Sequence, residues 1–263
     1  MSEIHRPLSC CAWALLASEL ENLEYLHGIG LRSIDIRPSG LRSLETRARR
    51  DALGLDVCCL AASHELPKGA ALDSADASAV AGARVHIEEG MTHAADLGAR
   101  RAYIVPEALV DDSSLDRYAE LLPRIADHGA RLGMGLCIEH FPGTAMPTVA
   151  ATLAFLERVA HPNLYLLFDI GHAQMSAEDP RAALLAAGER LGYVHLDDND
   201  GFDDLHLALT EGVQTTDSLA ELFTALDEVE YTGPTSLEMK SDLPDPADAI
   251  RRSYNIVQTI TGK

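Results

Sequence analysis

Apolar residues in this chain gather into eight short runs, and amphipathic or polar segments separate one run from the next. Apolar runs of roughly four to eight residues that are bounded by turn residues are typical of buried strands. We therefore predict strands over residues 8–15, 31–36, 55–62, 101–105, 134–139, 164–169, 191–196 and 235–239.

The segments between these runs show the boundary residues of helices. Ser18 and Ser114 stand where a side chain can cap a helix, and Gly54 and Gly133 stand where a helix would end. We predict helices over residues 18–27, 43–53, 74–97, 114–132, 148–159, 180–190, 217–229 and 246–259.

Eight strands that alternate with eight helices predict a parallel sheet with right-handed crossovers. The length of 263 residues is close to the roughly 250 residues of a closed barrel of this kind. We find no linker or internal repeat, and no glycine-rich phosphate-binding loop follows the first strand. The prediction is an α/β protein that forms a single (β/α)8 TIM barrel, as one domain over residues 1–263.

The net charge of −20 changes the picture of what this protein can bind. Proteins that bind DNA or RNA obtain their affinity from basic faces that neutralise phosphates. The chain has no basic cluster beyond residues 47–50, which fall at helical spacing on an expected solvated face. Nucleic acid is therefore not an expected partner. An anionic small molecule would also be repelled, unless a metal or a few arginines reverse the charge locally.

Cellular location is indicated by what the sequence lacks. No apolar segment reaches the ~18 residues that cross a bilayer, and the N-terminus does not have the pattern of a signal peptide. The five cysteines are odd in number and form no Cys-x-x-Cys pair, which favours buried reduced thiols. We expect a cytoplasmic protein without a membrane partner.

Four of the predicted strands end in a residue that can bind a metal. Active sites of barrels lie at the carboxyl ends of the strands. A buried carboxylate is costly unless it is paired or binds a metal. A single such residue is often only a hydrogen-bonding group, but four at equivalent positions on consecutive strands favour a metal site. Three carboxylates with one imidazole suit Mn, Co, Mg or Zn. These four candidate ligands are Glu139, Asp169, His195 and Glu238.

The segments around these four residues resemble a known superfamily. The resemblance is carried by Cys137-Ile138-Glu139, Phe168-Asp169-Ile170-Gly171-His172, Val194-His195-Leu196-Asp197-Asp198-Asn199-Asp200-Gly201 and Ser236-Leu237-Glu238. They look like the xylose isomerase-like TIM-barrel superfamily, which includes sugar and sugar-phosphate isomerases and epimerases, inosose dehydratases, hydroxypyruvate isomerases and endonuclease IV. The resemblance implies that the four candidate ligands bind one divalent metal and that His172 lies beside it.

For the isomerases and epimerases, the resemblance also implies a mechanism. The metal holds a ketose carbonyl and stabilises an enediolate. Glu139 and Glu238 would be the catalytic pair, one removing the proton and the other returning it. The expected function is a metal-dependent sugar or sugar-phosphate isomerase or epimerase that acts on a small-molecule substrate. Related barrels are often dimers or tetramers, so a homo-oligomer is a further expectation.

A second group of residues supports an alternative function. In endonuclease IV, an Asp-x-His pair after the seventh strand helps to bind a further metal, and Asp204 and His206 match it together with His172. His64 matches another ligand of that enzyme, whereas Glu107 stands where a histidine would be expected. The alternative is a multi-metal phosphoester hydrolase acting on a small nucleotide-like ester. Equally, Asp204 and His206 could only brace their loop by hydrogen bonds.

Residues that end other strands are candidates for the substrate pocket. They are Trp13, Arg37, Glu107 and Lys240. For each of them, packing or loop anchoring is as good an interpretation as contact with a substrate. A barrel that only binds a ligand and performs no chemistry is the third hypothesis, and the intact set of four metal ligands argues against it.

Overall fold

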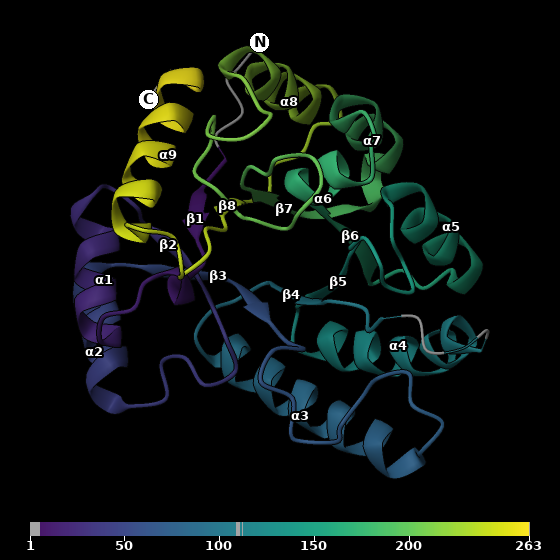
Figure 1. The fold of residues 1–263 in the computed structure, drawn as a ribbon. Coiled ribbons are helices and arrows are strands. Elements are labelled where there is room, and N and C mark those ends of the chain that lie inside the picture. Colours follow the sequence, from purple (N-terminus) through teal and green to yellow (C-terminus); the bar gives the residue numbers. More distant parts are fainter. Residues whose placement is uncertain (1–5, 109–110, 112, 263) are drawn as a thin grey trace.

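The apolar runs form the eight strands of one parallel sheet, in the order β1-β8-β7-β6-β5-β4-β3-β2 (Figure 1). The computed structural model describes residues 6–108, 111 and 113–262. A parallel bridge between Cys11 and Asp35 joins the exit of β1 to β2, so the sheet curls into a nearly closed barrel. The predicted (β/α)8 fold is confirmed. The strands are β1 Leu8–Cys10, β2 Ser33–Ile36, β3 Asp56–Ala61, β4 Arg101–Ile104, β5 Gly135–Glu139, β6 Leu164–Asp169, β7 Leu191–Leu196 and β8 Thr235–Leu237.

Helices surround the sheet on its outer side (Figure 1). Polar side chains start several of them, as at Ser18 and Asp179, whose oxygens accept backbone N–H groups of the first turn. The last helix closes the ring against the first, where the Tyr25 hydroxyl donates to the Ala247 carbonyl over 2.5 Å. The helices are α1 Glu19–Gly28, α2 Leu44–Leu53, α3 Ala77–Asp96, α4 Ser114–Arg131, α5 Val149–Val159, α6 Ile170–Met175, α7 Pro180–Ala187, α8 Thr216–Glu228 and α9 Pro246–Ile260.

Three of the differences from the predicted element boundaries affect the rim of the barrel. The first strand ends at Cys10 rather than at residue 15, because a short 3-10 helix over Ala12–Ala14 follows it. The last strand ends at Leu237, so Glu238 lies in the segment just after it. The short helix α6 begins directly after β6, where the sequence analysis predicted no helix. All three differences lie at the carboxyl ends of strands.

The interior of the barrel is filled by a small apolar layer beneath its carboxyl end. Tyr103 and Tyr193 are fully buried there beside Cys59, Cys137 and Leu167. The five cysteines of the chain are free thiols. Burial raises the pKa of Cys58 and Cys137 to about 12 and that of the other three well above its usual range. The larger apolar core lies between the sheet and the helices.

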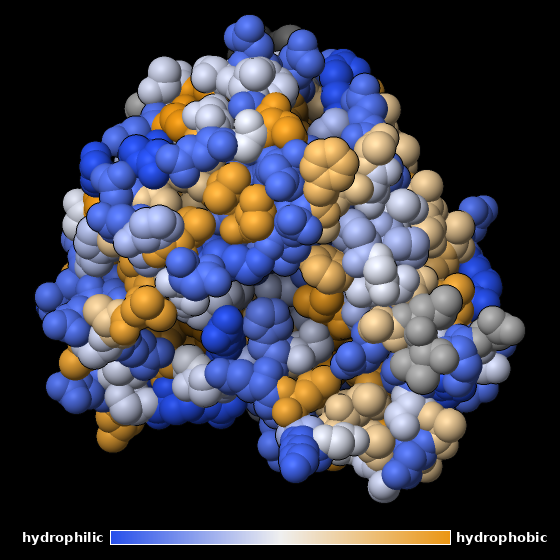
Figure 2. Space-filling model, viewed as in Figure 1, coloured by the Kyte–Doolittle hydropathy of each residue, from blue (hydrophilic) through white to orange (hydrophobic). Residues whose placement is uncertain are grey.

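The surface seen along the barrel is mainly hydrophilic, with separate apolar patches, and it is hollowed near its centre (Figure 2). Leu44 and Phe202 are the most exposed large apolar side chains among the described residues, each with 85% of its surface accessible. No helix in the described part of the chain has the length and apolar character that a membrane crossing requires.

Candidate metal centre

The four predicted ligands meet at one rim of the barrel. Glu139 and Asp169 end β5 and β6, His195 lies near the end of β7, and Glu238 follows β8. One ligand atom of each residue lies within 4.8 Å of those of the other three. All four are buried, and the most exposed of them, Glu238, has only 8% of its surface accessible. The parallel register therefore brings together residues that are up to a hundred positions apart.

The ring nitrogen Nδ1 of His195 is the centre of this cluster. It lies 2.6 Å from Glu238 Oε2, 3.2 Å from Glu139 Oε1 and 3.8 Å from Asp169 Oδ2. A ring nitrogen carries at most one proton, so it cannot satisfy three carboxylates. Asp169 Oδ2 is buried without a hydrogen-bond partner, which is costly for a carboxylate. Three carboxylates and one imidazole around this position fit a divalent cation such as Mn, Co, Mg or Zn.

Protons compensate part of this charge when no cation is bound. Burial would lower the pKa of His195, but the adjacent Glu238 and Glu139 carboxylates outweigh it and raise that pKa well above its usual range. Burial and the nearby Asp197 carboxylate raise the pKa of Asp169 to about 8. Burial would also raise the pKa of Glu238, but the His195 imidazolium lowers it instead. A metal ion at this position would therefore compete with protons.

Helix α6 places His172 beside the cluster. Its backbone N–H donates to Asp169 Oδ1 over 2.8 Å, so the candidate ligand Asp169 also caps this helix. The ring nitrogen Nδ1 lies 3.0 Å from the His140 carbonyl, and Nε2 lies 3.4 Å from Asp204 Oδ1. His172 therefore connects the cluster to the loop after β7.

A second cluster lies in that loop, next to the first. His172, Asp204 and His206 have ligand atoms within 4.8 Å of one another. His206 Nε2 lies 2.9 Å from Asp204 Oδ1, and His206 Nδ1 lies 2.9 Å from Asp197 Oδ2. Burial would lower the pKa of His206, but the Asp197 and Asp204 carboxylates raise it well above its usual range. His64, which was predicted with these residues, is not part of the second cluster.

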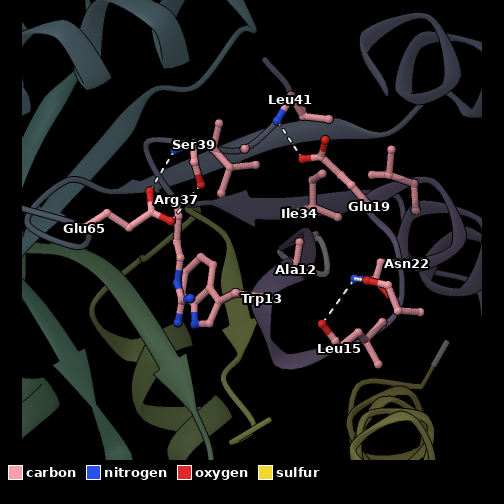
Figure 3. A pocket seen from close by; sticks show the side chains of 14 residues that line it. Ala12, Trp13, Leu15, Glu19, Asn22, Ile34, Arg37, Ser39, Leu41 and Glu65 are labelled. Atoms are coloured by element: carbon pink, nitrogen blue, oxygen red, sulfur yellow. Dashed lines mark hydrogen bonds between the residues drawn. The ribbon is translucent and has the colours of Figure 1, made fainter. Parts of the chain in front are cut away.

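The candidates from earlier strand ends separate into two groups. Trp13 and Arg37 lie together (Figure 3). The Trp13 ring is 5.6 Å from the ring of His64. Burial lowers the pKa of His64, while the nearby Glu238 carboxylate opposes this shift and Arg37 reinforces it. This trio therefore lies near the four-residue cluster.

The other two candidates have different surroundings. Lys240 donates to the Asp204 carbonyl and lies 3.7 Å from Asp204 Oδ2, so it borders the second cluster. The Glu107 backbone contacts Tyr118 and Ala145, and its carboxyl group lies near Asp73. In the described part of the chain, no contact joins Glu107 to either cluster.

Three buried residues of this region were not predicted as site residues. Asp35 is fully buried inside the barrel, where Oδ1 accepts from the Ser9 and Tyr193 hydroxyls over 2.8 and 2.7 Å. His140 accepts the Asp169 N–H through Nε2, and burial lowers its pKa to about 3, so its ring is neutral. Asp197 contacts His206. A charged residue within an apolar strand, as in Ser33–Ile36, was the available signal for Asp35.

Curated proteins that resemble this chain include an epimerase and a dehydratase. The chain is 33% identical to an L-ribulose 3-epimerase of Methylomonas sp. (strain DH-1) over 129 residues, which make up 48% of this chain and 42% of the relative. It is also 33% identical to an inosose dehydratase of Yersinia enterocolitica over 105 residues, which make up 38% of this chain and 35% of the relative. The chain thus spans less than half the length of these curated relatives.

Solved structures show the same fold over nearly the whole chain. A structure of L-ribulose 3-epimerase matches with a TM-score of 0.84 and 20% identity, covering 98% of this chain and 95% of that one. A crystal structure of D-psicose 3-epimerase in the presence of D-fructose matches with a TM-score of 0.80 and 19% identity, covering 98% and 100%. Residues 23–259 match the family model of the xylose isomerase-like TIM barrel. The chain therefore belongs to the xylose isomerase-like TIM barrel family.

Proposed function

We propose that this protein is a divalent-metal-dependent sugar or sugar-phosphate isomerase or epimerase. The observation that carries the proposal is the buried cluster of Glu139, Asp169, His195 and Glu238, in which three carboxylates converge on one imidazole nitrogen. The family and the curated relatives, an L-ribulose 3-epimerase and several inosose dehydratases, support a small sugar-like substrate.

The four residues of the cluster would hold one divalent cation, Mn, Co, Mg or Zn. Bound there, the cation would supply the positive charge that acidifies a proton next to a ketose carbonyl. Glu139 belongs to β5, and Glu238 belongs to the segment after β8. Strands β6 and β7 therefore lie between the two residues in the sheet. One of these carboxylates would take the proton and the other would return it. Return of the proton to the carbon it left, but on the opposite face, would give epimerisation, whereas its return to the former carbonyl carbon would give isomerisation.

Replacing Glu238 tests this proposal. With Mn²⁺ present, we expect the protein to epimerise or isomerise ketoses such as ribulose or fructose and to exchange the reacting proton with deuterium from solvent. Glu238→Gln keeps the size of the side chain but removes its basicity, so kcat/KM should fall by about 100-fold or more. The exposed Glu157 on α5 gives the matched control, Glu157→Gln. Full turnover by Glu238→Gln, or no turnover of any ketose with the four metals, would refute the proposal.

The second cluster favours a second candidate function, a multi-metal phosphoester hydrolase acting on a small nucleotide-like ester. His172, Asp204 and His206 converge, and His172 Nε2 and Asp204 Oδ1 are buried without a hydrogen-bond partner of good geometry. Two or three neighbouring metals would activate water against an ester. Metal counting separates the two functions. One metal per chain, unchanged by Asp204→Ala, contradicts the hydrolase, whereas two or three metals, one of them lost in His206→Ala, contradict the simple isomerase.

A further inference from the structure

Three nitrogen-bearing side chains form one corner beside the four-residue cluster. Trp13 lies in the 3-10 helix after β1, Arg37 directly follows β2, and His64 lies in the loop after β3. The Arg37 guanidinium carbon lies 5.2 Å from the centre of the Trp13 ring, and the Trp13 and His64 rings are 5.6 Å apart. Figure 3 shows the guanidinium stacked along the indole. We refer to Trp13, Arg37 and His64 as the donor corner.

None of the three side chains has a hydrogen-bond or ion-pair partner within residues 6–108, 111 and 113–262. The Arg37 Nε atom is buried and unpaired. Leaving a buried donor without an acceptor is energetically costly. Because the described residues provide no acceptor for this donor, a ligand is the natural source of one.

Carboxylates close to this corner do not serve Arg37. Glu65 lines the same cavity, but its oxygens accept from the Ser39 backbone N–H over 2.9 Å and the Ser39 hydroxyl over 2.7 Å (Figure 3). Glu19 lines it as well and accepts from the Leu41 N–H over 2.6 Å. Ser39 and Leu41 therefore hold these carboxylates, and neither carboxylate forms an ion pair with the Arg37 guanidinium.

The donor corner joins the candidate metal centre to an adjacent cavity of about 220 Å³. Trp13 and Arg37 line this cavity. On the other side, the His64 ring lies 6.0 Å from the Tyr103 ring, and the Tyr103 ring lies 5.1 Å from that of His195. A short sugar whose reacting carbons lie at the metal centre could therefore reach the corner with its far end.

We propose that the donor corner binds an anionic group, a phosphate or a carboxylate, at the far end of the substrate. This inference rests on the proposed function and narrows its substrate class to acidic sugars. Three donors that have no acceptor in the described part of the chain match the acceptor oxygens of an anion. The planar guanidinium of an arginine matches the geometry of a phosphate or a carboxylate. In a chain with a net charge of −20, an anionic substrate needs such a local reversal of charge.

Trp13 provides the test, because it is the only tryptophan of the chain. Its fluorescence can be titrated with ribulose 5-phosphate, with 5-ketogluconate and with neutral ribulose, in the presence of EDTA so that no metal contributes. We expect at least one of the two anions to bind at least tenfold more tightly than ribulose. Ribulose 5-phosphate tests whether the corner binds a phosphate group, and 5-ketogluconate tests whether it binds a carboxylate group.

Variants of Arg37 decide the assignment. Arg37→Gln should weaken binding of the preferred anion by tenfold or more and change ribulose binding less than twofold, whereas Arg37→Lys should retain part of the preference. Arg42→Gln removes the same charge from an exposed position nearby and should leave the preference intact. An equal affinity of the wild type for all three ligands, or an unchanged preference in Arg37→Gln, would overturn the inference.

The readout is binding and does not require turnover. An anion preference that depends on Arg37 in a protein without ketose turnover would leave the donor corner standing and refute the proposed function. Turnover of ribulose without any anion preference would support the proposed function and refute the anion site at the donor corner.

Discussion

Gly171 shows how closely the site is packed at the scale of a single residue. It lies in the first turn of α6, and its N–H donates to Asp197 Oδ1 over 3.0 Å. A Cβ atom at this position would lie 2.5 and 2.6 Å from the two carboxylate oxygens of Asp197 and would also collide with Asn199. The absence of a side chain therefore lets α6 approach the segment after β7 and brings Asp197 into reach of His206.

Replacing Gly171 with alanine should destabilise the protein. Asp197 and Asn199 are buried and would have to shift, so Gly171→Ala should lower the free energy of unfolding by about 1–3 kcal/mol in urea denaturation. Gly82 in α3 is the matched control, because its added Cβ would only touch Ala70 Cβ at 3.6 Å. Gly82→Ala should stabilise the protein by up to about 1 kcal/mol. A Gly171→Ala protein as stable as the wild type would contradict this account.

The segment between β7 and α8 is organised by one carboxylate. Asp198 Oδ2 accepts the Gly212 N–H over 2.7 Å, and Oδ1 accepts the N–H groups of Val213 and Gln214 over 3.0 and 3.1 Å. These bonds fasten the end of the segment to its beginning. Asp204 and His206 lie between the two fastened points, so the second cluster depends on Asp198 although Asp198 does not belong to it.

Removing this carboxylate should loosen the whole segment. Asp198→Ala leaves several backbone N–H groups without acceptors and should lower the free energy of unfolding by about 2 kcal/mol or more. Limited proteolysis should then cut between residues 200 and 214. Asp203→Ala, in the same segment but with an exposed side chain, should change neither measurement. Resistance of Asp198→Ala to proteolysis would show that other contacts hold the segment.

At the scale of elements, the places of residues could be predicted from the sequence where they follow from a regular pattern of apolar positions. The run of residues 164–169 predicted β6, and the end of that run placed Asp169 at the rim. Helix α6 was missed because six residues are too few for a helical period, and only the capping role of Asp169 marks its start. The first strand was predicted too long because apolar residues also continue through Ala12–Ala14.

The unpredicted site residues depend on contacts between distant elements. Asp35 is satisfied by Ser9 and Tyr193, which come from β1 and β7. His140 bonds the backbone of Asp169, and Asp197 bonds His206. Such partners have no fixed spacing in the sequence. The four candidate ligands could be predicted because a parallel barrel places all its strand ends on one rim.

At the scale of the whole molecule, several buried carboxylates gather where the strands end. The cluster contains three buried carboxylates, and Asp197 adds a fourth close to Asp169. The protons held by His195 and Asp169 offset only part of this charge. A bound cation would relieve the repulsion between residues of four different strands. It should therefore stabilise the barrel as a whole, since those strands must come together before the site exists.

Metal addition should accordingly raise the melting temperature. A ligand present at about 100 times its Kd contributes about 2.7 kcal/mol to the folded state. For a chain of roughly this size, that corresponds to a rise of about 5–10 °C. Calorimetry in Mn²⁺ and in EDTA measures the difference. Glu238→Gln should lose most of the rise, because it removes one ligand charge, whereas Glu157→Gln should keep it. If the melting temperatures of the wild type in Mn²⁺ and in EDTA coincide, the cluster does not bind a metal, and its buried carboxylates must be balanced by protons alone.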